Sequence, residues 1–171
     1  IEQEGTYPLP EAQLDRFLLH VQVGYPDSEA ETRILHLTRN EAQPQEASLP
    51  QPISEASLFT ARQQILNMYM SEPVERYIVE LILGTRQPER YSEELAQWIE
   101  YGGSPRATIA LDRCARAHAW LRGADFVSPD DVQNVLADVL RHRLILSFEA
   151  EANGISPDAV IAELMRCIPV A

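Results

Sequence analysis

The sequence predicts a mainly α-helical protein, a bundle of helices that follows one β-strand left over from an α/β core. Only residues 17–23 have the character of a strand, with apolar residues on both faces as in the interior of a larger sheet. From residue 24 onward the apolar residues recur at helical spacing. The chain has 171 residues, of which 45% are apolar, and this is enough for one globular domain with an attached segment.

The single strand indicates that the protein is larger than this sequence. A lone strand cannot satisfy its own backbone hydrogen bonds, so we expect the rest of its sheet to lie upstream of Ile1. The absence of an initiator Met likewise suggests a fragment or a processed product. Composition changes at residues 24–26, Gly-Tyr-Pro, which separates a segment 1–23 from a helical domain 24–171. Without its sheet, the strand is expected to pair with another copy or to fold back across the bundle.

Capping residues and prolines predict where the helices begin. Serine, proline and acidic residues occur in the order that favours the first turn of a helix. Gly123 is placed to end one helix, and residues 40–52 and 86–104 are predicted to be polar connections. The expected helix starts lie at Ser28, Ser54, Pro73, Pro105, Ser128 and Ser156.

The charged residues exclude two kinds of function for the chain alone. All 14 basic residues are arginines and the formal net charge is −12, so a nucleic-acid partner is not expected. A P-loop needs a lysine to neutralise the β- and γ-phosphates, and the sequence contains neither a lysine nor a Gly-x-x-x-x-Gly run. The chain is therefore not a complete P-loop NTPase. Residues 144–149, an apolar run ending in an acid, superficially resemble a Walker B strand, but we interpret them as a continuation of the preceding helix.

Neither a membrane span nor a metal site is predicted. No apolar run approaches the roughly 20 residues that cross a bilayer. The four histidines fall singly on different elements, without a second ligand at metal-binding spacing. Cys114 and Cys167 lie in apolar helical patterns and are interpreted as core residues of a protein in a reducing compartment, the cytoplasm.

Two arginines are candidates for binding an anion. Arg16 directly precedes the apolar strand. Arg106 follows Ser104 and Pro105 in the first turn of a helix, where the helix dipole disfavours a cation by about 0.3–1 kcal/mol. This position is reasonable if an anion binds there, because backbone N–H groups and the guanidinium would converge on it. The residues alone leave open whether Arg106 binds an anion or is an ordinary surface side chain.

Three motifs resemble the MoxR-type AAA+ ATPases. Residues 1–17, from Ile1 to Phe17, are similar to the segment that follows the sensor 1 Asn-Pro of that family. Residues 102–107, Gly-Gly-Ser-Pro-Arg-Ala, resemble its sensor 2 motif, in which the second residue is usually Ala. Residues 126–132 and 139–143 resemble the lid helix that follows. The resemblance runs from residue 1 to about residue 150.

The resemblance implies a fold and a role for each candidate arginine. Residues 1–23 would be the C-terminal tail of the AAA+ core, and residues 24–171 the helical lid domain. Arg16 matches the arginine finger, which reaches the γ-phosphate of a neighbouring subunit, and Arg106 matches the sensor 2 arginine that contacts the nucleotide. ATP and Mg²⁺ would be cofactors of the full-length parent protein. None is expected in this chain, because the Walker A and B motifs and the sensor 1 Asn are absent from it.

The resemblance also implies partners and a cellular role. The family forms rings, usually hexamers, of identical subunits that act on a client protein. Its members are chaperone-like remodellers that aid complex maturation or the insertion of cofactors or metals. Walker motifs just upstream of Ile1 would separate this function from the main alternative, a free-standing helical adaptor without nucleotide chemistry. An acidic helical hydrolase is a further alternative, and it would require clustered carboxylates or a nucleophile beside a base.

Overall fold

The computed structural model describes residues 9–41 and 50–170. Residues 1–8, where the first of the three motifs begins, and most of the predicted connection 40–52 lie outside the described residues. The described part is mainly helical, which confirms the predicted fold class. No helix among the described residues is long and apolar enough to cross a membrane.

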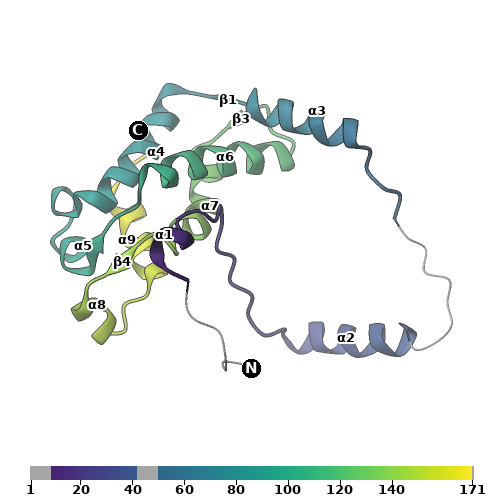
Figure 1. Cartoon of the computed structure of the whole chain (residues 1–171), viewed down its shortest axis with the longest axis horizontal. Helices are drawn as coiled ribbons and strands as arrows, with labels where there is room; N and C mark the ends of the chain where they lie inside the picture. Colours follow the sequence, from purple (N-terminus) through teal and green to yellow (C-terminus); the bar gives the residue numbers. More distant parts are fainter. Residues whose placement is uncertain (1–8, 42–49, 171) are drawn as a thin grey trace.

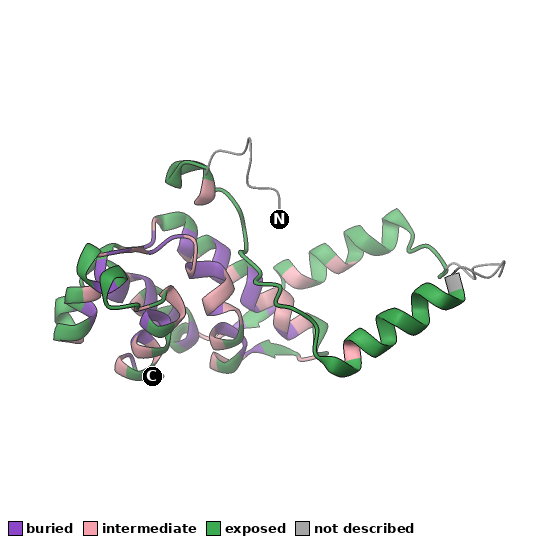
Figure 2. Cartoon of the chain, turned by 90° about the horizontal axis from the view of Figure 1, so that it is seen from below, coloured by how far each residue is buried: buried purple, intermediate pink, exposed green. Residues whose placement is uncertain are grey.

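Four longer helices form the body of the protein around one apolar core. They are α4 (Glu72–Arg86), α6 (Pro105–Leu121), α7 (Pro129–Leu140) and α9 (Pro157–Cys167). Each turns an apolar face inward, as expected for helices with apolar residues every third or fourth position. Figure 2 shows that the buried positions gather in this body. Its largest fully buried side chains include Tyr77, Leu81, Ile82, Leu111, Leu136, Leu140, Ile161 and Leu164.

Short elements close the body at two places. Strands β1 (Tyr69–Met70) and β3 (Phe126–Val127) pair in parallel before α4 and α7. Strands β2 (Ile99–Tyr101) and β4 (Ile145–Leu146) pair antiparallel. The remaining short elements are a 3₁₀ turn (Pro88–Arg90), α5 (Glu93–Trp98) and α8 (Phe148–Ala152).

Three helices precede the body. The short helix α1 (Glu11–Leu14) lies beside α7 and β4, whereas α2 (Ser28–Glu41) stands away from the rest of the chain (Figure 1). Helix α3 (Glu55–Leu66) lies along one end of α6, and the indole N–H of Trp120 donates a hydrogen bond to Gln64 at 3.0 Å. Almost all of α2 and α3 is exposed (Figure 2).

The predicted helix starts are confirmed, with one difference in the capping. The hydroxyls of Ser54, Ser128 and Ser156 accept hydrogen bonds from first-turn backbone N–H groups, as capping serines do. At the start of α2, however, the carboxylate of Asp27 rather than Ser28 accepts the N–H of Ala30, at 2.7 Å. Asp27 precedes the helix by one residue, where its side chain can turn back to the first turn.

One predicted connection and one predicted helix extension have a different secondary structure. Residues 86–104 were expected to be a polar loop, but they hold the 3₁₀ turn, α5 and β2. Residues 144–149 do not continue α7, which ends at Leu140; they form β4 and the start of α8. The alternation of buried Leu144, half-buried Ile145 and buried Leu146 is the period of a strand, and β2 supplies its partner.

The strand expected at residues 17–23 does not form within this chain. The segment has no strand hydrogen bonds, and its apolar side chains are largely exposed, with Val23 at 90%. Its first half does lie back on the body, because the backbone N–H of His20 donates to the carbonyl of Asp138 at 2.8 Å. A strand needs a neighbouring strand to pair with, and the described residues offer none at this place.

Candidate functional site

The start of α6, which carries Arg106, is fixed against the end of α4. The hydroxyl of Thr85 accepts the N–H of Gly103 at 2.9 Å and donates to the carbonyl of Ile82 at 2.7 Å. The Nε of Arg86 donates to the carbonyl of Gly103 at 2.6 Å. A Cβ on Gly102 would lie 2.2 Å from the carbonyl oxygen of Thr85. The chain can therefore pass this close to α4 only because residue 102 is glycine.

The first turn of α6 uses backbone N–H groups within the chain, whereas the Arg106 guanidinium is largely exposed. Pro105 has no N–H, and the hydroxyl of Ser104 accepts the N–H of Arg106 at 3.1 Å. The N–H of Ala107 is bonded to the carbonyl of Ser104 at 2.9 Å. The N–H groups of Arg106 and Ala107 are thus bonded to Ser104 in this structure, and the expectation that backbone N–H groups converge on an anion here stays a prediction. The side chain of Arg106 is 56% exposed and keeps N–H donors that face solvent.

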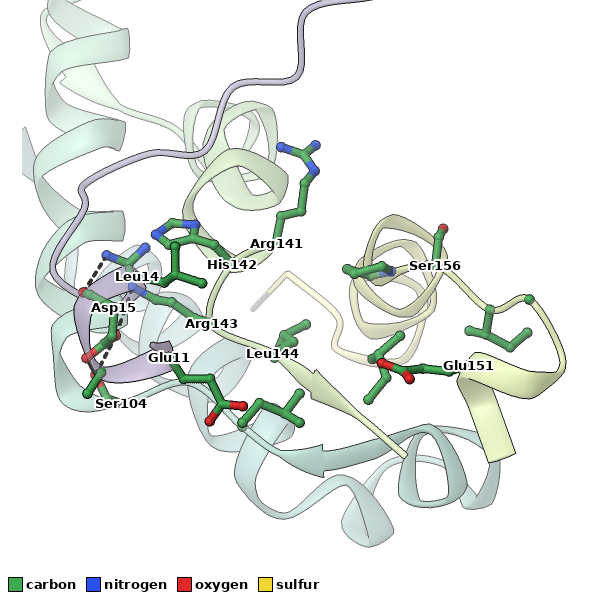
Figure 3. Close-up of a pocket in the computed structure, with 17 residues that line it drawn as sticks. Glu11, Leu14, Asp15, Ser104, Arg141, His142, Arg143, Leu144, Glu151 and Ser156 are labelled. Carbon is green, nitrogen blue, oxygen red and sulfur yellow. Dashed lines mark hydrogen bonds and ion pairs between the residues drawn. The ribbon is translucent and has the colours of Figure 1, made fainter. Parts of the chain in front are cut away.

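Asp15 joins the start of α6 to the segment that contains Arg16. Its carboxylate accepts the hydroxyl of Ser104 at 2.9 and 3.0 Å, Nη1 of Arg106 at 3.2 Å and Nε of Arg143 at 3.2 Å. Figure 3 shows Asp15 lying between Ser104 and Arg143. Burial alone would raise the pKa of Asp15, but hydrogen bonds from Ser104 and Arg106 and the charge of Arg143 hold this pKa below its usual value. We call Asp15, Ser104, Arg106 and Arg143 the Asp15 junction.

Arg143 is the buried cation of this junction. Its side chain is only 2% exposed. Besides the Asp15 carboxylate, its guanidinium donates to the backbone carbonyls of Asp15 and Leu18 at 3.3 Å, of Phe17 at 2.5 Å, and of Val139. Burial lowers the pKa of Arg143, whereas the Asp15 carboxylate raises it. A buried guanidinium needs such a full set of acceptors, and most of them come from residues 15–18.

The two residues before Arg143 hold the same segment from the other side. His142 Nε2 lies 3.0 Å from the carbonyl of Phe17, and Arg141 Nη1 donates to the carbonyl of His20 at 2.6 Å. Burial is the largest of the effects that lower the pKa of His142. The neutral ring with its proton on Nε2 suits this arrangement, because the carbonyl can accept that proton. Residues 141–143 thus hold the backbone between Asp15 and His20 by hydrogen bonds to its carbonyl groups.

The structure brings the two predicted arginines to the same junction. Arg106 contacts Asp15 directly, and Arg16 is the next residue along the chain. The side chain of Arg16 is exposed, and it makes no ion pair with any residue between 9–41 or 50–170. An open hollow of about 700 Å³ adjoins Asp15 and Ser104, with Glu11 and Glu151 at its edges (Figure 3). In the part of the chain that the structure describes, no three potential metal ligands gather.

Asp15 and Arg143 were not among the residues singled out from the sequence. Arg141 to Arg143 read as cations that complement the end of a helix dipole, and Asp15 as part of an acidic turn. Asp15 and Arg143 are 128 positions apart in the sequence, and no local sequence pattern predicts a contact between them. The sequence offers one weak indication of their burial. Asp15 follows Leu14 and Arg143 precedes Leu144, so each charged residue is adjacent to an apolar one.

The chain is similar in sequence to known AAA+ proteins. Residues 93–164 match the AAA lid domain family. The chain is 40% identical over 169 residues to the chaperone MoxR1 of Mycobacterium tuberculosis, covering 98% of this chain and 44% of that protein. It is 32% identical over 186 residues to the protein MoxR of Paracoccus denitrificans, covering 99% and 53%. Over almost its whole length, the chain resembles part of the MoxR-type AAA+ proteins.

A solved structure gives the same result for the fold of this chain. A crystal structure of a Cytophaga hutchinsonii protein, proposed to be an ATPase, matches the whole chain with a TM-score of 0.93 at 40% identity. The chain covers 52% of that structure. The chain thus spans about half the length of the relatives it matches.

Proposed function

We propose that this chain is the lid portion of a longer MoxR-type ATPase, with residues 1–23 belonging to the end of its core and residues 24–171 forming the lid. Arg106 senses nucleotide bound under the lid, as a sensor 2 arginine. Arg16 acts as the arginine finger at the nucleotide site of a neighbouring subunit. ATP and Mg²⁺ would be bound mainly by the nucleotide-binding part of the protein, which supplies the Walker motifs that this chain lacks.

The exposed guanidinium of Arg106 at the Asp15 junction is the observation that best supports this proposal. Asp15 holds one end of the group at 3.2 Å, and 56% of the side chain remains open. The Arg16 side chain extends from the same junction and is also exposed. Guanidinium groups stabilise the charge of a transferring phosphoryl group. Two exposed arginines beside one junction therefore suit contacts with two nucleotides, Arg106 with that of its own subunit and Arg16 with that of the neighbour.

The wider role follows from the relatives. One of them is named a chaperone, and a ring of identical subunits would place Arg16 of one subunit beside the nucleotide of the next. We therefore propose a chaperone-like remodeller that uses ATP hydrolysis for complex maturation or for cofactor or metal insertion. Its partners would be neighbouring subunits of a ring, a hexamer as is usual in the family, and a client protein. The free thiols of Cys114 and Cys167 suit the reducing cytoplasm.

Alanine substitutions in the full-length protein separate the roles of the two arginines. We expect Arg16→Ala to keep ATP binding and to lose turnover, since an arginine finger contributes about 10³–10⁵ in rate. Arg106→Ala should weaken ATP binding or lid closure more strongly. Arg113→Ala is the matched control, because Arg113 is an exposed arginine on the same helix. Steady-state ATPase rates and nucleotide titrations measure both effects, and equal behaviour of all three variants would contradict the assignment.

Mixed rings test whether Arg16 acts on the neighbouring subunit. An Arg16→Ala subunit should still hydrolyse its own ATP when its neighbour supplies an intact finger. We therefore expect activity to recover when Arg16→Ala protein is mixed with a variant that lacks the phosphate-loop lysine of the nucleotide-binding part. If subunit exchange is confirmed and no activity returns, Arg16 acts within its own subunit or only structurally.

A further inference from the structure

The Asp15 junction ties the backbone of the Arg16 segment to the lid at several points. The guanidinium of Arg143 donates to three carbonyls between residues 15 and 18, and the Nε2 of His142 shares one of them. Arg143 itself follows α7 and is almost fully buried. Residues 15–18 are therefore held by the lid body rather than by contacts of the exposed Arg16 side chain.

The same carboxylate ties this segment to the helix that carries Arg106. The hydroxyl of Ser104 and Nη1 of Arg106 both bond to Asp15, so the first turn of α6 and the Arg16 segment share one anchor. The Asp15 side chain is 18% exposed, and its contacts with Ser104 and Arg143 are screened less than a surface ion pair would be. A displacement of the start of α6 would therefore be passed to the backbone on either side of Arg16.

We propose that Asp15 and Arg143 are positioning residues that couple the two arginines. They join the peptide bearing Arg16 to the helix bearing Arg106, so that a lid movement on nucleotide binding also moves the finger offered to the neighbouring subunit. This inference rests on the function proposed above. It adds a mechanical link between two nucleotide sites, made by one carboxylate and one buried guanidinium of this chain.

A double-mutant cycle in the full-length protein tests the positioning role. Asp15→Asn keeps the shape of the side chain and removes the charge that holds Arg143 and Arg106. We expect it to lower kcat at saturating Mg-ATP by about 10- to 100-fold, because small misplacement of a catalytic group costs about that much. In an Arg16→Ala background, the same Asp15→Asn change should alter kcat less than about twofold, since no finger remains to be placed.

The matched controls distinguish positioning from general damage. Glu72→Gln removes a carboxylate from an exposed pair with Arg76 on α4, far from the junction in sequence, and should leave kcat unchanged in both backgrounds. Arg143→Lys keeps a buried cation but loses the fork that reaches several acceptors, and it should reproduce the Asp15→Asn pattern. If Asp15→Asn lowers kcat by the same factor whether or not Arg16 is present, Asp15 has a merely structural role, and the proposal is overturned.

Mixed rings show whether Asp15→Asn slows hydrolysis in its own subunit or in the neighbouring one. Asp15→Asn on subunits that donate a finger but lack the phosphate-loop lysine should slow hydrolysis by their neighbours. The same change on subunits whose own finger is already Arg16→Ala should not slow those rings further. Unaltered turnover in the first mixture would contradict the coupling. If Arg16→Ala itself leaves turnover unchanged, the proposed finger fails, and that result is distinct from an additive double-mutant cycle.

Discussion

At the scale of single residues, two carboxylates, the buried Asp131 and the half-buried Asp15, each accept hydrogen bonds from more than one part of the chain. Asp131 is 1% exposed and accepts Nε of Arg122 at 2.7 Å and Nη2 at 2.8 Å, with Nδ1 of His118 at 2.8 Å. It also completes a capping box with Ser128 at the start of α7. Asp131 therefore links the end of α6 to the start of α7, much as Asp15 links the N-terminal segment to α6.

Removing the Asp131 carboxylate should destabilise the lid measurably. We expect Asp131→Ala to lower the free energy of unfolding by about 1–3 kcal/mol, because several hydrogen bonds to a charged group are lost at a buried site. Asp130→Ala, at the exposed neighbouring position, should lower the free energy of unfolding by only about a few tenths of a kcal/mol, because it loses just the favourable interaction of its charge with the helix dipole. Urea unfolding of the 171-residue chain at pH 7 measures both values. Equal losses for the two variants would contradict this account.

The same prediction has a pH dependence. The hydrogen bonds from Arg122 lower the pKa of Asp131 far below its usual value of 3.8. A depressed pKa in the folded state means that the unfolded state takes up a proton first as the pH falls. The contribution of Asp131 is thus complete above about pH 5 and decreases below pH 4, so the gap between the wild-type and Asp131→Ala proteins should narrow there.

At this scale the sequence singled out two candidate arginines but not their contacts. Arg106 was singled out because the helix dipole disfavours a cation at its position, and Arg16 because it directly precedes an apolar segment. Asp15 and Arg143 were not, because the value of a charged residue depends on partners distant in the chain. Asp131 was recognised only as a first-turn acid, and its bonds to Arg122 and His118 required the packing of α6 against α7.

At the scale of elements, the capped helices were predictable and the short elements were not. A capping serine accepts hydrogen bonds from first-turn N–H groups, and proline and acidic residues favour the turn that follows. Ser128 and Ser156 therefore predict the starts of α7 and α9 from the sequence alone. Strands of two or three residues such as β2 and β4 depend on each other across more than 40 residues, and neither has a pattern of its own. The strand expected at 17–23 does not form for the same reason, since no strand of residues 9–41 or 50–170 pairs with it.

The two glycines before α6 should respond differently to a methyl group. A Cβ at Gly102 would lie 2.2 Å and 2.4 Å from the carbonyl oxygen and carbon of Thr85, which are backbone atoms that cannot turn aside. We expect Gly102→Ala to cost about 1–3 kcal/mol or more, as overpacking does, and to displace Arg106. At Gly103 the nearest atom is Cβ of Ala107 at 3.1 Å, so a small shift suffices.

Gly103→Ala is therefore the matched control, with an expected cost below about 1 kcal/mol. The related sensor 2 motif usually carries alanine at this position, which agrees with the available space. Thermal or urea unfolding of both variants measures the difference. A Gly103→Ala protein that is as unstable as Gly102→Ala would show that the turn is tight throughout rather than only where it passes Thr85.

At the scale of the whole molecule, the apolar core occupies only part of the chain. The buried apolar side chains of the described residues run from Met68 to Ile168. Helix α2 contributes none of them, and its apolar residues Ile34, Leu35 and Leu37 are about half exposed. The sequence predicted α2 from its cap and apolar spacing. Spacing alone could not tell that no other part of the described chain would cover its apolar face (Figures 1 and 2).

This distribution predicts very unequal stability along the chain. An isolated helix of 14 residues is marginal in water, because packing of an apolar face supplies most helical stability in proteins. In the 171-residue chain we therefore expect the amide hydrogens of α2 to exchange within about tenfold of unfolded rates. Those in the middle of α6 and α7 should exchange at least about 10³-fold more slowly, since they open only with the core.

Hydrogen exchange followed by mass spectrometry measures this contrast, and α3 supplies an internal control. Helix α3 is also largely exposed, but it contacts α6 and its Gln64 bonds to Trp120, so its protection should fall between those of α2 and α6. In the full-length protein, added protection of α2 would show that the nucleotide-binding part covers its apolar face. Protection of α2 equal to that of α6 in the 171-residue chain alone would contradict the prediction, because only packing against this body or a second copy could supply it.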